Sequence, residues 1–144
     1  MFIGEYESSI DDKNRVVLPR KFRDAIDVER EGEELYLTVD PDGCLLICPP
    51  SEWNRRLQQL DQSPFAKEKL RRFRRYLSSM TEPSRCDKQG RLLLPSRLIQ
   101  EVGIGKEIFL VGNISVIEVW PAALWTERRK QARNEFSQDI EDLF

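Results

Sequence analysis

The chain carries one nine-residue motif twice, and this repeat constrains the fold more than any other feature. Residues 11–19 read Asp-Asp-Lys-Asn-Arg-Val-Val-Leu-Pro, and residues 87–95, 76 positions later, read Asp-Lys-Gln-Gly-Arg-Leu-Leu-Leu-Pro. Each copy has an Asp, an Arg four positions later, three aliphatic residues and a Pro. Because the same turn and strand occur twice in the chain, we expect a two-fold architecture. The repeat also predicts a binding surface that is present twice, and not a single catalytic pocket.

The fourth position of the motif predicts a tight turn in both copies. It is Asn14 in the first copy and Gly90 in the second, the residue types that most readily adopt positive φ. Asp11 and Asp87 are expected to fix the turn by accepting backbone N–H groups, or to act as internal partners for Arg. For Arg15 and Arg91 two interpretations stay open, a surface ion pair and a binding contact.

The residues around the motif predict an α+β fold. Each half reads as strand, turn, strand, short helix, hairpin and longer helix, with hairpin strands at 35–39, 44–48, 108–111 and 116–120. Longer helices are expected from Ser51 through Leu60, over 65–79 and over 122–136. Because the aliphatic triplets lack polar alternation, they predict strands buried on both faces. We expect one intertwined domain with internal pseudo-two-fold symmetry.

Positive charge gathers near the first copy of the motif. The net charge of the 144 residues is only −2, so nucleic-acid binding would need segregated charge. Two Arg-bearing turns related by two-fold symmetry match the way β elements enter a DNA groove, where Arg pairs with guanine and Lys holds phosphates. The residues predicted to contact DNA are Lys13, Asn14, Arg15, Arg20 and Lys21.

Charge is also segregated elsewhere along the chain. Residues 67–75 hold six basic residues and one acidic residue, whereas the last ten residues hold four acidic residues and no base. Such runs are typical of solvated helix faces. The helices expected at 65–79 and 122–136 are also candidates for lateral contacts between subunits or for an outer rim.

Several classes of function are excluded by the residues present. The chain has no His, no nucleophile with a base at a recognisable spacing and no Gly-rich phosphate loop, so we expect no enzyme, no cofactor and no small-molecule substrate. The three cysteines, Cys44, Cys48 and Cys86, lack the Cys-x-x-Cys spacing of a metal site. Cys44 and Cys48 flank an apolar strand and are expected to be small buried residues. No membrane span or secretory signal is predicted, which favours the cytoplasm.

A set of motifs across nearly the whole chain resembles the MraZ family of bacterial transcriptional regulators. These motifs are Met1-Phe2-x-Gly4, Ile10-Asp11-x-Lys13-x-Arg15-x-x-x-Pro19, Cys44-Leu45-x-x-x-Pro49-x-x-x-Trp53, Cys86-Asp87-x-x-Gly90-Arg91-Leu92-Leu93-x-Pro95 and Glu118-x-Trp120. The family's Asp-x-x-x-Arg signature corresponds to Asp11 with Arg15 and to Asp87 with Arg91. Asn14 departs from the family pattern, which usually has Gly before the first Arg. Asn tolerates the same backbone but its side chain would alter base contact.

The resemblance implies a fold and a function. The fold would be two tandem AbrB-like swapped-hairpin halves that form an intertwined pseudo-two-fold β-barrel core with peripheral helices. The first half would span residues 1–62, a helical connector 63–80, and the second half with its C-terminal helix 81–144. Members repress the division and cell-wall gene cluster by binding short direct repeats in promoter DNA. They form ring-shaped homo-oligomers and associate with the nucleoid.

Two other functions stay open beside repression. One is an AbrB-type antitoxin-like module whose main partner is another protein, although such antitoxins usually carry one hairpin copy per chain. The other is a ring scaffold without a role on DNA. Within the DNA-binding interpretation, the second copy has fewer basic neighbours, so Arg91 could serve DNA contact, packing or subunit contact.

Overall fold

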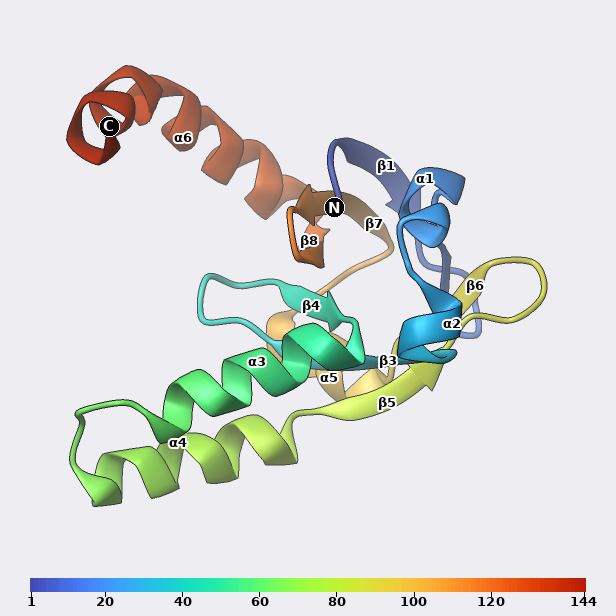
Figure 1. Cartoon of the computed structure of the whole chain (residues 1–144). Coiled ribbons are helices and arrows are strands. Elements are labelled where there is room, and N and C mark those ends of the chain that lie inside the picture. Colours follow the sequence, from blue (N-terminus) through green and yellow to red (C-terminus); the bar gives the residue numbers. More distant parts are fainter.

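The computed structural model describes all residues 1–144 and confirms the α+β class (Figure 1). A six-stranded antiparallel sheet has the order β1-β7-β8-β4-β3-β5, and β2 and β6 form a separate two-stranded ribbon. The elements in chain order are β1 (Glu5–Ser9), β2 (Arg15–Val17), α1 (Arg20–Asp24), α2 (Val28–Glu31), β3 (Glu34–Val39), β4 (Leu45–Cys48), α3 (Pro50–Asp61), α4 (Lys67–Ser79), β5 (Glu82–Arg85), β6 (Arg91–Leu93), α5 (Ser96–Val102), β7 (Glu107–Asn113), β8 (Val116–Pro121) and α6 (Ala122–Leu143).

The two halves of the chain exchange their first strands. β1 precedes the first motif yet pairs with β7 of the second half, and β5 precedes the second motif yet pairs with β3 of the first half. β4 and β8, one from each half, join the two hairpins at the centre of the sheet. The sheet is open, because β1 and β5 form its two edges and do not pair with each other. The expected closed barrel is therefore not what the strand pairing shows.

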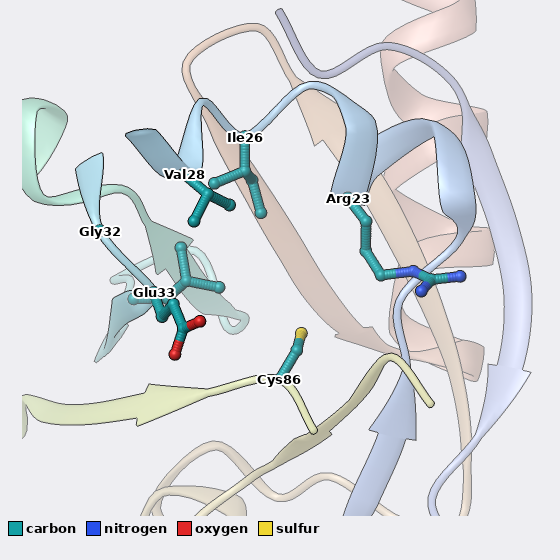
Figure 2. Close-up of a pocket in the computed structure, with 7 residues that line it drawn as sticks. Arg23, Ile26, Val28, Gly32, Glu33 and Cys86 are labelled. Carbon is teal, nitrogen blue, oxygen red and sulfur yellow. The ribbon is translucent and has the colours of Figure 1, made fainter. Parts of the chain in front are cut away.

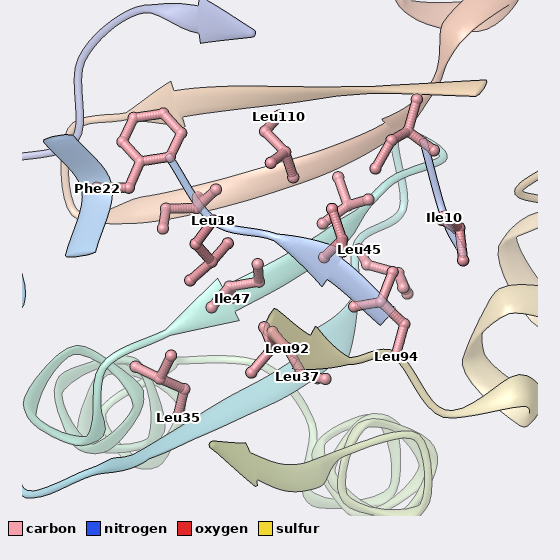
Figure 3. Packing of buried hydrophobic residues seen from close by; sticks show 14 of the residues in the cluster. Ile10, Leu18, Phe22, Leu35, Leu37, Leu45, Ile47, Leu92, Leu94 and Leu110 are labelled. Carbon is pink, nitrogen blue, oxygen red and sulfur yellow. The ribbon is translucent and has the colours of Figure 1, made fainter. Parts of the chain in front are cut away.

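The core consists of two apolar layers, one on each face of the sheet. On one face, alternate residues of the sheet pack against the β2–β6 ribbon, α1 and α5, as Figure 3 shows for Leu37, Ile47 and Leu110 beside Leu18 and Leu92. On the other face, Cys44, Leu46, Cys48, Val111, Val116 and Trp120 are covered by Trp53 of α3 and by Leu124 and Trp125 of α6. Period-two alternation in the hairpins thus supplies both layers.

The aliphatic triplets alternate, contrary to the prediction that they are buried on both faces. Val16 and Leu92 are fully buried, whereas Val17 and Leu93 are 52% and 51% exposed. The ribbon has a core beneath it but nothing above it, so only one face of each strand is covered. The middle residues of the two strands are therefore buried, but each triplet also contains one apolar residue that faces outward, Val17 in the first copy and Leu93 in the second.

The helices differ from the predictions mainly at their ends. α3 begins at Pro50 with Pro49 as its N-cap, and the hydroxyl of Ser51 instead donates to Glu31 Oε2 at 2.9 Å. α2 has no counterpart among the predicted elements, and α6 extends seven residues beyond the predicted end to Leu143. No helix combines the length and the apolar content needed to cross a membrane.

Candidate nucleic-acid interface

The first motif folds into a turn that is closed by the Asp11 side chain. Asp11 Oδ1 accepts the backbone N–H groups of Lys13 and Arg15 at 2.9 and 2.8 Å. Asp11 Oδ2 accepts Arg15 Nε–H at 2.9 Å. Asn14 has a φ of 61°, and its N–H donates to the Asp11 carbonyl at 3.0 Å. Both the positive φ and the turn-forming role of Asp11 are confirmed.

The second motif repeats this geometry almost atom for atom. Asp87 Oδ1 accepts the backbone N–H groups of Gln89 and Arg91, both at 2.9 Å. Asp87 Oδ2 accepts Arg91 Nε–H at 2.7 Å, and Gly90 has a φ of 79°. In both copies the guanidinium is bound to the carboxylate through Nε alone, so its terminal nitrogens are left without a hydrogen bond inside the chain. The Asp holds an Arg whose outer edge is available for a partner.

The hydrogen bonds in each turn also act on the carboxyl groups. The backbone N–H of Arg15 lowers the pKa of Asp11 below its ordinary value, and the backbone N–H of Arg91 lowers the pKa of Asp87 in the same way. The Arg side chains add to both shifts. Each carboxylate is therefore ionised at neutral pH, when it both closes the turn and orients the Arg.

The two motif copies meet on one surface. β2 and β6 pair antiparallel, with Arg15 opposite Leu93 and Val17 opposite Arg91. Because the neighbouring pair Val16 and Leu92 faces the core, the other two pairs face outward. The outer face of the ribbon is thus a pseudo-two-fold patch of two Arg and two aliphatic side chains. We call these four residues the ribbon patch.

Each turn is also tied to the strand of the other copy. The Gly90 carbonyl accepts the N–H of Leu18 at 2.9 Å, and the Asn14 carbonyl accepts the N–H of Leu94 at 2.8 Å. In each copy, the carbonyl of the turn residue with positive φ thus accepts the N–H of the residue that follows the ribbon strand of the other copy. Neither turn is complete without the opposite half of the chain.

The difference between Asn14 and Gly90 has a tertiary cause. A Cβ on Gly90 would lie 2.7 Å from Cζ of Arg23, whose Nε–H donates to the Leu18 carbonyl at 3.2 Å. The residue 76 positions after Arg23 is Ile99, which has no guanidinium to press on the first turn. A side chain at position 90 would therefore have to displace the flexible end of Arg23 as well as adopt a positive φ.

Arg23 also lies at one end of a small pocket of about 190 Å³ beside the second turn. Figure 2 shows this pocket, with Arg23 on α1 at one end, Val28 and Gly32 at the other, and Cys86 below. Desolvation raises the pKa of the Cys86 thiol above its ordinary value. The thiol is consequently a packing group at neutral pH and a poor nucleophile.

Exposed positive charge surrounds the ribbon patch unequally. Lys13 and Lys21 are exposed and form no ion pair, and Arg20 makes only a loose contact of 3.8 Å with Asp24. At the second copy, Arg97 corresponds to Lys21 but is bound to Glu82 at 3.1 Å. Lys88, at the tip of the second turn, is exposed and unpaired. Lys88 and the outward-facing Val17 and Leu93 were not among the site residues predicted from the sequence.

The remaining candidate groups are structural. Cys44 and Cys48 are fully buried in the sheet, and burial raises the pKa of both thiols, that of Cys48 to about 12. They behave as small apolar residues, as predicted. No group of three or more Cys, Asp or Glu residues has the arrangement of a metal site.

The comparisons with known proteins agree with the repeat. A family model described as "MraZ protein, putative antitoxin-like" matches residues 1–76 and again residues 79–144. A protein of Lachnoclostridium phytofermentans named "Transcriptional regulator MraZ" is 37% identical over 143 residues, which is 99% of this chain and 97% of the relative. Proteins of the same name from Desulfitobacterium hafniense strain Y51 and Clostridium acetobutylicum are 36% and 39% identical, over 99% and 88% of this chain and 96% and 86% of the relatives.

Proposed function

The chain belongs to the MraZ family of transcriptional regulators, and we propose that it is a repressor that binds specific DNA sequences through its β2–β6 ribbon. The family is not a family of enzymes. Promoter DNA is the partner that fits a transcriptional regulator, and the ribbon patch with its flanking lysines is the surface that we assign to it.

The ribbon patch is the observation that carries this proposal. A two-stranded antiparallel ribbon fits the major groove of B-DNA, where Arg can bind guanine O6 and N7 with two parallel hydrogen bonds. Asp11 and Asp87 leave the terminal nitrogens of Arg15 and Arg91 available for such bonds. Exposed Val17 and Leu93 lie between them and suit contacts with thymine methyl groups.

The residues divide into contacts and turn-formers. We propose that Asn14 and Arg15 contact bases and that Lys13, Arg20 and Lys21 hold phosphates. Asp11, Asp87 and Gly90 build the two turns. We assign Arg91 to the same face as Arg15, since the pseudo-two-fold axis of the ribbon relates the two side chains.

The finer details follow from the family resemblance. We propose residues 1–62 and 81–144 as swapped-hairpin AbrB-like halves joined by the connector 63–80, a description supported by the exchange of β1 and β5. A ring-shaped homo-oligomer on direct repeats of the division and cell-wall promoter would compensate for the chain's net charge of −2, because several ribbons acting together raise the effective concentration at each repeat. Such a protein would be cytoplasmic and associated with the nucleoid.

The antitoxin-like description of the family supports a second candidate function, binding to another protein. Antitoxins of the AbrB type usually have one hairpin copy per chain, whereas the family model matches this chain twice. Purification from the native cell with a small protein bound in equal amount would favour this second candidate.

Electrophoretic mobility shift with the upstream region of the protein's own gene tests the proposal. We expect the Arg15→Ala variant to keep its fold and oligomeric state but to lose specific binding. Arg128→Ala is the matched control, because Arg128 is exposed, forms no ion pair and lies on α6 away from the ribbon (Figure 1). Equal binding of the parent and Arg15→Ala would remove Arg15 from the interface. No preference of the parent over a scrambled duplex would refute sequence-specific binding.

A further inference from the structure

We propose that residues 135–144 of α6 in one copy dock in a groove of a second copy, between its α3–α4 pair and its β3–β4 hairpin. This inference rests on the homo-oligomer of the proposed function and assigns the two surfaces that would build it. We call residues 135–144 the tail segment.

The tail segment carries an apolar stripe that nothing covers. α6 is anchored near its start, where Trp125 packs on the sheet and Arg129 binds Glu5 at 2.8 Å. Every residue from 127 to 144 is exposed. Phe136, Ile140 and Leu143 nevertheless follow one another at spacings of four and three, so they share one helix face, and Phe136 and Leu143 are 63% and 77% exposed. Such a stripe on a projecting helix is typical of an interaction surface.

The flank of this stripe is acidic. Glu135, Asp139 and Asp142 repeat at the same spacing, one position before each apolar residue, so they form a parallel row on the helix. None of these carboxylates forms an ion pair, and Asp142 accepts only the amide of Gln138, at 3.0 Å. The tail segment has no basic residue. A partner surface should therefore combine an apolar hollow with positive charge.

The molecule contains a groove of this kind on another element. The groove has a volume of about 340 Å³ and lies between α3, α4 and the β3–β4 hairpin. Trp53, Leu60, Phe73 and Leu77 give it apolar walls, and Phe73 is half exposed at its edge. Arg56 also lines it, with Nε bound to Glu52 at 2.9 Å and terminal nitrogens that make no hydrogen bond.

The helix beside the groove supplies unpaired positive charge. Of the six basic residues in 67–75, only Arg74 pairs with a carboxylate, Asp61 at 3.0 Å. Lys69 lies four positions before Phe73 and so on the same side of α4, and Arg72 follows Lys69 by three positions along the flank of that side. Lys69 sits over the Phe65 ring, 4.6 Å from its centroid. Asp40 is the one acidic residue of the lining, so the positive charge that complements the tail segment comes from Arg56 and from the unpaired basic residues of α4.

The occupant must come from a second copy. In one chain the tail segment and the α3–α4 pair form separate projections of the molecule (Figure 1). Donor and acceptor are different surfaces, so the contact is head-to-tail and each copy offers one of each. Contacts of this type repeat from copy to copy and close into a ring when the rotation permits.

Two charge-reversed variants test the contact by size-exclusion chromatography with light scattering. The tail variant carries Asp139→Lys and Asp142→Lys, and the groove variant carries Lys69→Glu and Arg72→Glu. We expect the parent to be an oligomer and each variant to be a monomer with an unchanged circular dichroism spectrum. Mixed in equal amounts, the variants should assemble again into species larger than a monomer. The intact tail of the groove variant fits the intact groove of the tail variant, and the lysines of the altered tail also complement the glutamates of the altered groove. The control with Glu29→Lys and Glu127→Lys should keep the parent's size.

The outcomes separate this inference from the proposed function. A parent that is monomeric at high concentration overturns both the docking and the ring. A parent that is oligomeric, with both variants unchanged in size, overturns the docking alone. A groove variant that stays oligomeric but binds DNA less tightly also overturns it, and assigns the basic run of α4 to phosphate contacts.

Discussion

The guanidinium of Arg23 fills the space beside Gly90 that a side chain there would need, since a Cβ on Gly90 would lie 2.7 Å from Arg23 Cζ. Arg23 belongs to the first half of the chain and Gly90 to the second. The repeat is therefore symmetric in its turns and asymmetric in what packs against them. The residue type that fits the fourth motif position therefore depends on the neighbouring side chain as well as on the φ of the turn.

Exchanging these two turn residues should have unequal effects. Gly90→Asn places a side chain at positive φ and displaces Arg23 from its bond to the Leu18 carbonyl, so we expect a loss of about 1–3 kcal/mol. Asn14→Gly should change stability by less than about 1 kcal/mol, because that turn already has a permissive residue. Urea unfolding of both variants measures the difference. In an Arg23→Ala background the cost of Gly90→Asn should shrink, and an unchanged cost would show that Arg23 is not its cause.

Neighbouring leucines in the second motif should differ sharply in their contribution to stability. Leu92 is fully buried against the sheet, so Leu92→Ala should lose about 2–5 kcal/mol through lost burial and a cavity. Leu93 faces outward, and Leu93→Ala should cost at most about 0.5 kcal/mol. Thermal or denaturant unfolding compares the two. Similar losses at both positions would mean that the ribbon is covered on both faces.

Glu52 should give the fold a distinct sensitivity to acid. It is buried, accepts the Arg55 guanidinium at 2.6 Å and the Ser115 hydroxyl at 3.2 Å, and so joins α3 to the β7–β8 turn. The Arg55 side chain lowers the pKa of Glu52 from 4.5 to about 2. A lowered pKa stabilises the fold above pH 4.5, and this contribution should disappear as the pH falls towards 2.

Replacement of Glu52 by Gln checks this assignment. Glu52→Gln should lose about 1–3 kcal/mol at neutral pH, because both Arg partners lose a charged acceptor. Between pH 5 and pH 2 its unfolding free energy should fall less steeply than that of the parent. Glu29→Gln, on the exposed helix α2, should follow the parent. Parallel curves for the parent and Glu52→Gln would contradict the lowered pKa.

The turn carboxylates should keep their lowered pKa values when the Arg side chain is removed. The largest cause of the shift at Asp11 is the backbone N–H of Arg15, which Arg15→Ala retains. Carboxyl titration by NMR should therefore place the pKa of Asp11 below 3.8 in both the parent and Arg15→Ala. The stabilising contribution is present above that ordinary value and is lost as the pH falls through the lowered pKa. A return to 3.8 in the variant would show that the turn had opened.

The salt dependence of DNA binding should distinguish lysines from arginines at the interface. Lys13→Gln and Lys88→Gln should each weaken binding similarly on all duplexes and reduce the slope of log K against log salt by about 0.9, as expected for one phosphate contact. Arg15→Ala and Arg91→Ala should instead reduce the preference for the specific duplex. Fluorescence anisotropy from low to high salt measures both effects. An unchanged slope for Lys88→Gln would place the second turn away from the backbone.

Much of the local structure could be predicted from the sequence because it depends on neighbouring residues. The turn at Asn14, the hairpin strands and the bonds accepted by Asp11 all arise within a few positions. The prediction failed where coverage by distant segments decides the outcome. Val17 resembles its buried neighbours in sequence and is exposed because no element lies above the ribbon.

The sequence by itself determined that two similar turns exist, each with an Asp that holds an Arg, because the φ preferences and local acceptors act within one motif. Only the tertiary structure decided that the turns share one surface. The antiparallel pairing of β2 with β6 brings Arg15 and Arg91 onto one face, and the bonds from Leu18 and Leu94 complete each turn with the other half. Pairing between segments 76 residues apart depends on the burial of Val16 and Leu92 in a common core, which no local pattern specifies.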